Sequence, residues 1–293
     1  MGRWKGIPEN GKNTKEQETW SPLSKLRKAP LSFSGGFYSP EFVEKHGLKK
    51  EGCIECGDRD AILLWVPEYL EIALREDGEI WCRLCPNGPG RHKEKEAFKT
   101  SKGTFLSRND GEFGGKLLTP KRKAVRGNFV KVFEFGGRIY AVDSLTHFVT
   151  ANTAIYMFSD TLEPVLLYGE KWPHPCSRDS VAFRGLHIRK DAAFLLVSGR
   201  HREHWYDASK DAEDVSYLFE ISNGWFLLKE TLPYFFHSGN ELLISNGHLY
   251  LGMDKVVADV DLQTKTIRAY TPLPEEAEAE SRRLFEKYGW KYF

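Results

Sequence analysis

The most specific chemical pattern in the chain is a pair of cysteine motifs, Cys53-x-x-Cys56 and Cys82-x-x-Cys85. Four thiolates can close a tetrahedron around Zn²⁺, and this spacing is typical of zinc knuckles that face each other across a β-hairpin. Gly57, directly after the second cysteine, suits the tight turn in which backbone N–H groups point at sulfur. We therefore predict a structural Zn²⁺ held by Cys53, Cys56, Cys82 and Cys85, with no open position for a catalytic water.

The alternatives to zinc are four buried free thiols or a redox pair, and the spacing alone leaves both open. Residues 1–5 lack the apolar segment of a signal peptide, and no apolar run reaches the roughly 18 to 20 residues that span a bilayer. We expect a cytoplasmic protein with no membrane partner, in which cysteines act as thiols or metal ligands rather than as disulfides.

A second candidate is the run Asn-Asp-Gly-Glu-Phe-Gly-Gly at residues 109–115. Asn109, Asp110 and Glu112 could gather oxygen atoms around a cation, or supply the carboxylates of a hydrolase, although the spacing of an EF-hand is absent. The alternative is a bulged turn, because Asn and Asp are turn formers and the glycines allow close backbone packing. The sequence leaves both interpretations open.

The third candidate is a long polar segment at residues 198–214, which its polarity excludes from a core. Two aromatic residues with polar tips lie beside several charges, the composition of a protein–protein contact. We predict partner binding through Arg200, Arg202, Glu203, Trp205 and Tyr206. The alternative is a solvated loop whose tryptophan packs onto its own strands.

Basic residues dominate residues 91–131, although the whole chain carries a formal net charge of only +1. A basic stripe beside a zinc module could follow a phosphate backbone, and Lys121, Arg122 and Lys123 are its densest part. Nucleic acid is therefore an alternative partner. The other interpretation of this basic stretch is a set of solvated loops. The chain contains no P-loop, no dinucleotide fingerprint and no hydrolase motif, so we expect a binding protein rather than an enzyme.

The elements that must position these residues are short hairpins. Residues 241–245 and 248–252 flank Asn246-Gly247, a strong signal for a type I′ turn, and strands at 256–262 and 265–270 complete a four-stranded unit. Similar hairpins are expected between residues 129 and 168 and between 186 and 232. The aromatic content of 13% suits packing between sheets.

We predict an all-β fold, an irregular β-propeller with a β-sandwich as the alternative. The expected division is a polar arm at 1–30, a zinc-knuckle module at 31–102, hairpin repeats at 103–272 and a C-terminal helix at 273–293. Within the second segment, residues 31–38 would form a strand that closes the last blade, and Ser39-Pro40 would start a short helix.

Residues 107–115 and the degenerate hairpins of residues 130–271 resemble the irregular β-propeller proteins encoded beside bacterial polymorphic toxins as immunity proteins. The resemblance covers most of the chain but not the cysteine module. It implies a protein that binds and neutralises a partner toxin inside the producing cell and performs no chemistry of its own.

Overall fold

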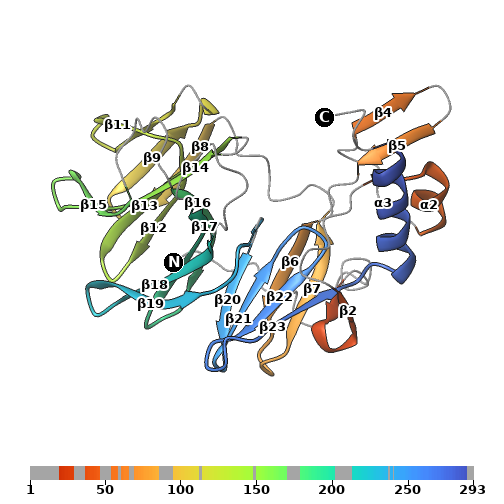
Figure 1. The fold of residues 1–293 in the computed structure, drawn as a ribbon. Helices are drawn as coiled ribbons and strands as arrows, with labels where there is room; N and C mark the ends of the chain where they lie inside the picture. Colours follow the sequence, from red (N-terminus) through yellow and green to blue (C-terminus); the bar gives the residue numbers. More distant parts are fainter. Residues whose placement is uncertain are drawn as a thin grey trace, which may run out of the picture. The chain divides into compact units, whose positions relative to one another are not determined.

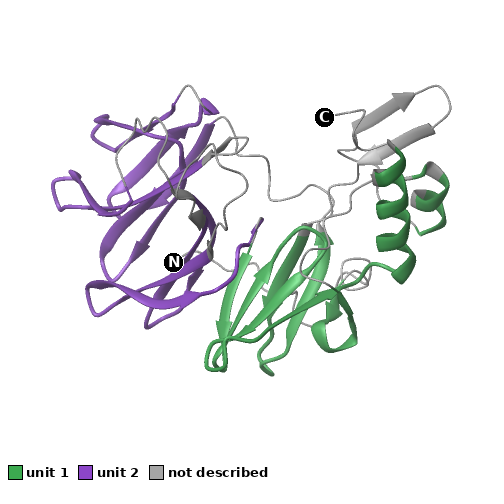
Figure 2. Ribbon diagram, in the orientation of Figure 1, with its two compact units in different colours: residues 1–90, 240–293 green, residues 91–239 purple. Residues whose placement is uncertain are grey.

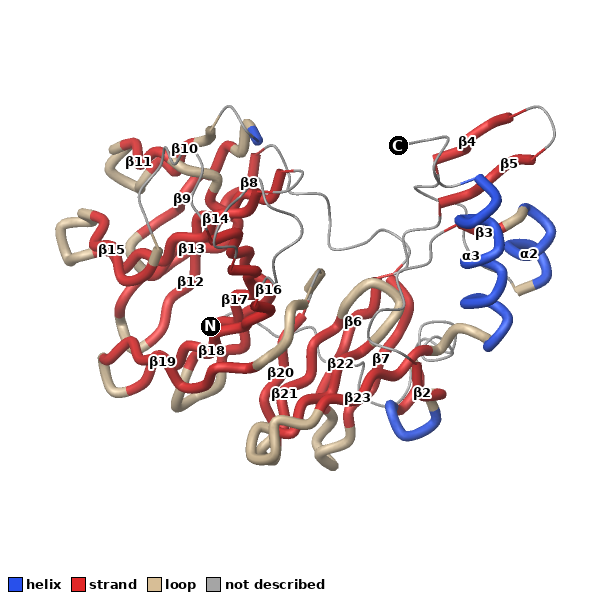
Figure 3. The backbone as a smooth tube through the Cα atoms, viewed as in Figure 1, coloured by secondary structure: helices blue, strands red, loops and turns tan. Residues whose placement is uncertain are grey.

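The chain is mostly β-strand and falls into two compact units, residues 1–90 with 240–293 and residues 91–239 (Figures 1 and 2). The predicted all-β class is confirmed, and the strands fill most of the traced backbone (Figure 3). The computed structural model describes residues 20–29, 37–46, 54–58, 61–65, 69–85, 95–111, 114–147, 150–169, 179–201, 213–236, 238–239 and 241–288.

The unit of residues 91–239 contains three antiparallel sheets, each built from four strands that are consecutive in the chain. Their spatial orders are β11-β10-β9-β8, β12-β13-β14-β15 and β16-β17-β18-β19. The strands are β8 (Lys95–Thr100), β9 (Gly103–Arg108), β10 (Lys116–Leu118), β11 (Ala124–Arg126), β12 (Phe129–Phe135), β13 (Arg138–His147), β14 (Thr150–Phe158), β15 (Pro164–Tyr168), β16 (Asp179–Ile188), β17 (Ala193–His201), β18 (Glu213–Ser222) and β19 (Trp225–Leu232).

Alternating side chains let the middle sheet of this unit form a core on each face. On one face, Phe129, Ile139 and Tyr156 pack with Phe105 and Leu117 of the β8–β11 sheet. On the other face, the β12–β15 sheet packs against the β16–β19 sheet. That second core contains Val130, Phe133, Tyr140, Val142, Ile155, Val181, Ala193, Leu195, Val197, Phe219 and Ile221. The three sheets are therefore stacked face to face.

In the unit of residues 1–90 and 240–293, the main sheet has the order β2-β23-β22-β21-β20. Asn246 and Gly247 have φ values of 51° and 77°, as the predicted type I′ turn requires. The predicted four-stranded unit is present with nearly the predicted bounds. Its strands are β20 (Glu241–Ser245), β21 (His248–Gly252), β22 (Val257–Asp261) and β23 (Ile267–Thr271), and the fifth is β2 (Arg27–Ala29).

An N-terminal strand does pair with the last strand of this sheet, but it is not the segment we expected. Arg27 lies opposite Thr271 and Ala29 opposite Ala269, so the pairing strand lies inside the segment predicted to be a polar arm. The guanidinium of Arg27 explains this placement, because its Nε donates to the Leu273 carbonyl at 2.7 Å. Of residues 31–38, only β3 (Phe37–Tyr38) is described, and it pairs with β5 (Ala61–Trp65) instead.

A second sheet, β1-β7-β6, packs on the main sheet of the same unit. Their shared core contains Leu23, Leu70, Ile72, Ile80, Cys82, Leu243 and Val257. The strands are β1 (Ser21–Pro22), β6 (Tyr69–Leu74) and β7 (Ile80–Cys85), and a 3-10 turn, η1 (Leu23–Lys25), follows β1.

The remaining elements of this unit are a small sheet, β3-β5-β4, and two helices. Helix α2 (Pro40–Lys45) begins as predicted, because the Ser39 hydroxyl accepts the Phe42 N–H at 3.2 Å and proline occupies the first turn. The predicted C-terminal helix is α3 (Glu275–Tyr288), with its acidic residues in the first turn. The small sheet adds β4 (Ile54–Asp58) and β5 (Ala61–Trp65). None of the described helices is long and apolar enough to cross a membrane.

Candidate functional site

The predicted zinc ligands fall partly outside the described residues, because Cys53 is not among them. Where the backbone is described, it continues as strand through positions that we expected to be knuckles. Cys56 lies in β4 opposite Leu63, and β7 runs through Cys82 to Cys85, which lies opposite Tyr69. The pairing of residues 83–85 with β6 keeps the backbone after Cys82 extended.

Cys82 is the cysteine whose surroundings are described. Its thiol is buried among Leu23, Leu70, Ile72 and Leu243, and this burial raises its pKa to about 12. A protonated thiol suits an apolar core, whereas a zinc ligand must be a thiolate. Within the described ranges, His, Cys, Asp and Glu side chains form no group of three or more that could hold a metal. The four-cysteine zinc site remains a prediction.

The run at residues 109–115 is described except for Glu112 and Phe113, and its described part is a turn. The Asn109 side chain accepts the Gly111 N–H at 2.9 Å, which is a local Asx turn. Asp110 accepts from the Arg108 Nε at 2.8 Å, and this contact lowers the pKa of Asp110. A Cβ on Gly115 would collide with the Arg108 carbonyl, so only glycine fits there. Asn109 and Asp110 therefore have structural partners, and the role of Glu112 remains a prediction.

Next to this turn lies a buried polar pair that sequence reasoning did not single out, Asn128 and Asp143. Asn128 Nδ2 donates to the Gly111 carbonyl at 2.7 Å, and the Asn128 N–H donates to Asp143 Oδ1 at 2.7 Å. The other carboxylate oxygen, Oδ2, is buried without a hydrogen-bond partner. Burial raises the pKa of Asp143 to about 6, against a smaller lowering by the Asn128 N–H. Asp143 therefore holds the backbone at the start of β12. Its burial in the folded chain disfavours the ionised carboxylate, which the unfolded chain favours.

The predicted partner-binding loop joins β17 to β18. The strands extend to His201 and from Glu213, so the Arg200 backbone belongs to β17 and pairs with Asp214. Arg202, Glu203, Trp205 and Tyr206 lie outside the described residues, and the docking prediction stays untested. The described ends of this segment, His201 and Glu213, pair at the end of the sheet opposite to the Asn223-Gly224 turn, about 30 Å away along the ten-residue β18.

Exposed apolar side chains gather on β19, one of the two edge strands of the β16–β19 sheet. Trp225 is 69% exposed, and Leu227 and Leu228 are each 53% exposed. Between them Phe226 turns inward and stacks on Phe219, with ring centroids 4.9 Å apart. The sequence does not distinguish these residues from apolar core residues, because it does not show that their strand lies at the edge of a sheet.

The main sheet of the other unit carries a histidine–carboxylate pair that no sequence pattern predicted. His248 Nδ1 lies 2.7 Å from Asp259 Oδ1, and the imidazole stacks on the Tyr250 ring. Asp259 also faces Arg268 across the β22–β23 ladder. No nucleophile is hydrogen-bonded to this pair among the described residues, so it lacks the third member that acyl-transfer chemistry needs.

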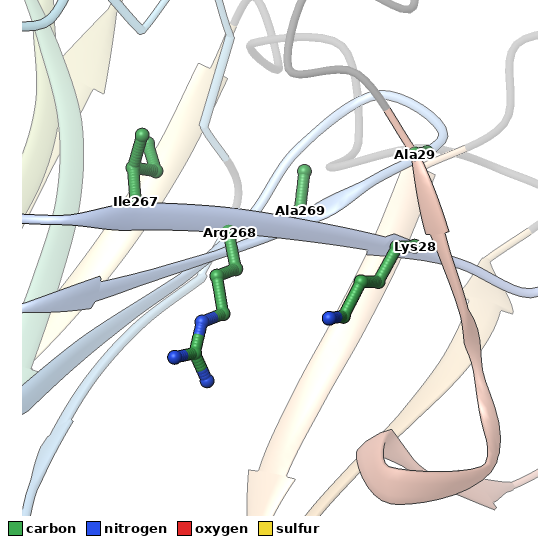
Figure 4. Close-up of a pocket in the computed structure, with 5 residues that line it drawn as sticks. All are labelled: Lys28, Ala29, Ile267, Arg268 and Ala269. Carbon is green, nitrogen blue, oxygen red and sulfur yellow. The ribbon is translucent and has the colours of Figure 1, made fainter.

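A shallow hollow of about 270 Å³ lies where β2 meets β23. Figure 4 shows that its lining side chains diverge, with Ile267 and Ala269 on one side of the strand and Arg268 and Lys28 on the other. A small-molecule site needs polar groups that converge on one point. This hollow does not provide them.

Comparison with known proteins leaves the family open. No protein-family model and no curated protein matches the chain. Among solved structures, the N-terminal domain of Nup159 aligns with 77% of this chain and 66% of that domain, about two thirds of its length, at 12% identity and a TM-score of 0.29. The computationally designed Ika8 protein aligns with 70% of this chain and 87% of its own at 12% identity and a TM-score of 0.25. YjhT aligns with 84% and 99% at 10% identity and a TM-score of 0.24.

Proposed function

We propose that this chain is a non-catalytic binding protein whose sheets are the blades of an irregular β-propeller. Successive four-stranded sheets that stack face to face support this arrangement, as does an N-terminal strand that pairs with the C-terminal β23. A ring of this kind is rigid and presents its edges and loops to partners. The β-sandwich alternative predicts two face-packed sheets, whereas the unit of residues 91–239 stacks three.

The observation that carries the binding role is the exposed apolar edge at β19. Half of the large exposed apolar side chains of the described residues lie on this one strand, namely Trp225, Leu227 and Leu228. An edge strand leaves one row of backbone N–H and C=O groups unpaired. A partner that offers an extended segment can pair with this row and cover the tryptophan, which is binding by strand addition.

The partner proposed is a toxin encoded beside this chain, as the resemblance to immunity proteins implies, with binding in the cytoplasm. The hydrolase alternative is less well supported, because Asp110 is engaged by Arg108 and Asn109 by the turn backbone. A structural Zn²⁺ at Cys53, Cys56, Cys82 and Cys85 is part of the proposal. Side chains alternate along a strand, so metal binding would require β7 to open beyond Cys82.

The decisive experiment is co-expression of the chain with the protein encoded next to it. We expect the two to co-purify at a fixed stoichiometry and the host cells to survive the toxin only when this chain is present. Purified chain should show no turnover of generic ester, phosphate or glycosidic substrates. Robust turnover that disappears in Glu112→Gln would instead establish the hydrolase alternative.

A further inference from the structure

The outer face of the β8–β11 sheet carries a row of four cations. The strand registers place Lys95 opposite Arg108, Arg108 opposite Lys116, and Lys116 opposite Arg126. Residues directly opposite each other in a sheet share a face, and all four are exposed. The sequence shows only a basic stretch here, because these four residues become neighbours through the strand register alone.

This face contains no carboxylate on its strands. Its other members are Ala97, Lys99, Thr104, Leu106, Leu118 and Ala124, whereas Phe105 and Leu117 point the other way into the core. Like charges directly opposite each other destabilise a sheet, and three such pairs follow one another here. The row therefore does not favour the stability of the fold, whereas a bound anion would neutralise the repulsion between its cations.

One carboxylate near the row is supplied by the turn after β9. Asp110 is paired with Arg108, and the charges of Lys116 and Lys95 also lower its pKa. Lys95, Lys116 and Arg126 form no ion pair with any described carboxylate. Asp110 thus occupies part of a positive surface and leaves most of it for another anion.

The geometry of the row selects the class of anion. Neighbouring strands lie about 4.8 Å apart, so four cations extend along a line of about 14 Å, which suits a string of phosphates. None of the described strand residues on this face is aromatic, so these residues offer no ring to stack on unpaired bases. A lipid surface would need apolar residues to insert, and among the described residues of this face Leu106 is the one large apolar side chain that is exposed.

We propose that the outer face of the β8–β11 sheet binds the phosphate backbone of duplex nucleic acid through Lys95, Arg108, Lys116 and Arg126. Binding of this kind is independent of base sequence and weakens with salt, because each neutralised phosphate releases counterions. The surface is separate from the β19 edge, so this activity goes beyond the toxin-binding function proposed above. The proposed nucleic-acid contact does not include Lys121, Arg122 and Lys123. These residues lie in a turn, where Lys123 is paired with Glu163.

The test measures fluorescence anisotropy of a labelled 20-base-pair duplex of arbitrary sequence between 50 and 200 mM NaCl. We expect the logarithm of the affinity to fall against the logarithm of salt with a slope of about −3 to −4, as for roughly four phosphate contacts. The double variant Lys95→Glu with Lys116→Glu leaves the Arg108–Asp110 pair intact and should weaken binding at least tenfold. Asp110→Asn removes the internal anion and should tighten binding severalfold.

The matched control is Lys28→Glu with Arg268→Glu, which changes the net charge by the same amount in the other unit. It should leave duplex affinity unchanged. Equal weakening by both double variants, or no duplex binding at 50 mM NaCl, would overturn the proposal. Preference for phosphatidylserine vesicles over the duplex would overturn it in favour of a lipid surface. Asp110→Asn keeps the test informative if the double variant does not fold.

Discussion

The hydroxyl oxygens of Ser198 and Ser216 lie 2.8 Å apart across β17 and β18, and both side chains are fully buried. The Phe236 N–H donates to Ser198, and Ser216 donates to the Tyr234 carbonyl, each at 2.7 Å. Since a hydroxyl has one proton, Ser198 must donate its own to Ser216. The pair therefore binds an N–H and a carbonyl two residues apart in the segment that follows β19.

The preceding sheet repeats this arrangement with other residues. Ser144 and Thr153 are register partners on β13 and β14, with hydroxyls 3.1 Å apart. The Phe183 N–H donates to Ser144, and Thr153 donates to the Val181 carbonyl at 2.9 Å. Each hydroxyl pair thus links its sheet to the strand or segment that follows. This is an internal repeat of contacts without a repeat of sequence.

Replacing Ser198 by Ala should destabilise the chain by about 1 to 3 kcal/mol, because the buried Phe236 N–H loses its acceptor. Urea unfolding followed by tryptophan fluorescence measures the change. The control is Ser222→Ala at the end of β18. Its hydroxyl donates to the partly exposed Glu220, and its loss should cost at most about 0.5 kcal/mol. Equal losses of unfolding free energy in the two variants would show that the buried hydroxyl pair stabilises the fold no more than the partly exposed Ser222 does.

Local patterns predicted the hairpins well and their assembly poorly. Asn246-Gly247 identified β20 and β21 to the residue, because the turn chemistry and the alternation on either side agree. By contrast, Arg27–Ala29 looked like part of a polar arm, since a three-residue strand stabilised by Arg27 bonds to distant carbonyls has no local signal. The hydroxyl pairs and the row through Lys95 and Arg108 were missed for the same reason: register is a long-range property.

Asp143 should make the folded state less stable as the pH rises. Its pKa in the folded chain, about 6, lies above the ordinary 3.8, so the folded state binds more protons between these values. Stability from this group is full below about pH 4 and is lost as the pH rises to about 6, after which the loss is constant. A shift of this size corresponds to about 3 kcal/mol at most.

The comparison that isolates this effect is wild type against Asp143→Asn, which keeps an oxygen for the Asn128 N–H. Because Asp191, Glu220 and other carboxylates with lowered pKa values act in the opposite direction, only the difference between the two proteins is informative. The stability of Asp143→Asn relative to wild type should increase between pH 4 and pH 7. Parallel stability curves would show that Asp143 titrates normally.

A zinc ligand and a buried thiol at Cys82 predict different metal contents for the purified chain and different effects of Cys82→Ala. If zinc is bound, elemental analysis should find one Zn²⁺ per chain, and Cys82→Ala should lose both the metal and the local fold, since metal binding contributes to folding. Cys176 is the one cysteine of the sequence outside the two motifs, so Cys176→Ala is the control and should retain the metal. If Cys82 is only a packed thiol with a pKa of about 12, its replacement by Ala should cost stability alone, and no zinc should be found in either protein.

Two adjacent residues of β19 allow partner binding and fold stability to be tested separately, because Trp225 is exposed and Phe226 is packed inward. Trp225 is largely exposed, so Trp225→Ala should leave the melting temperature within about 2 °C of wild type while weakening partner binding by roughly 2 kcal/mol, as for an aromatic anchor. Phe226 points inward onto Phe219, so Phe226→Ala should lower the melting temperature by several degrees and leave a folded fraction that still binds. Calorimetric titration with the co-purified partner and thermal unfolding measure the two effects. If Trp225→Ala binds as tightly as wild type, the partner docks elsewhere, and the predicted contact within residues 198–214 becomes the site to test with Trp205→Ala.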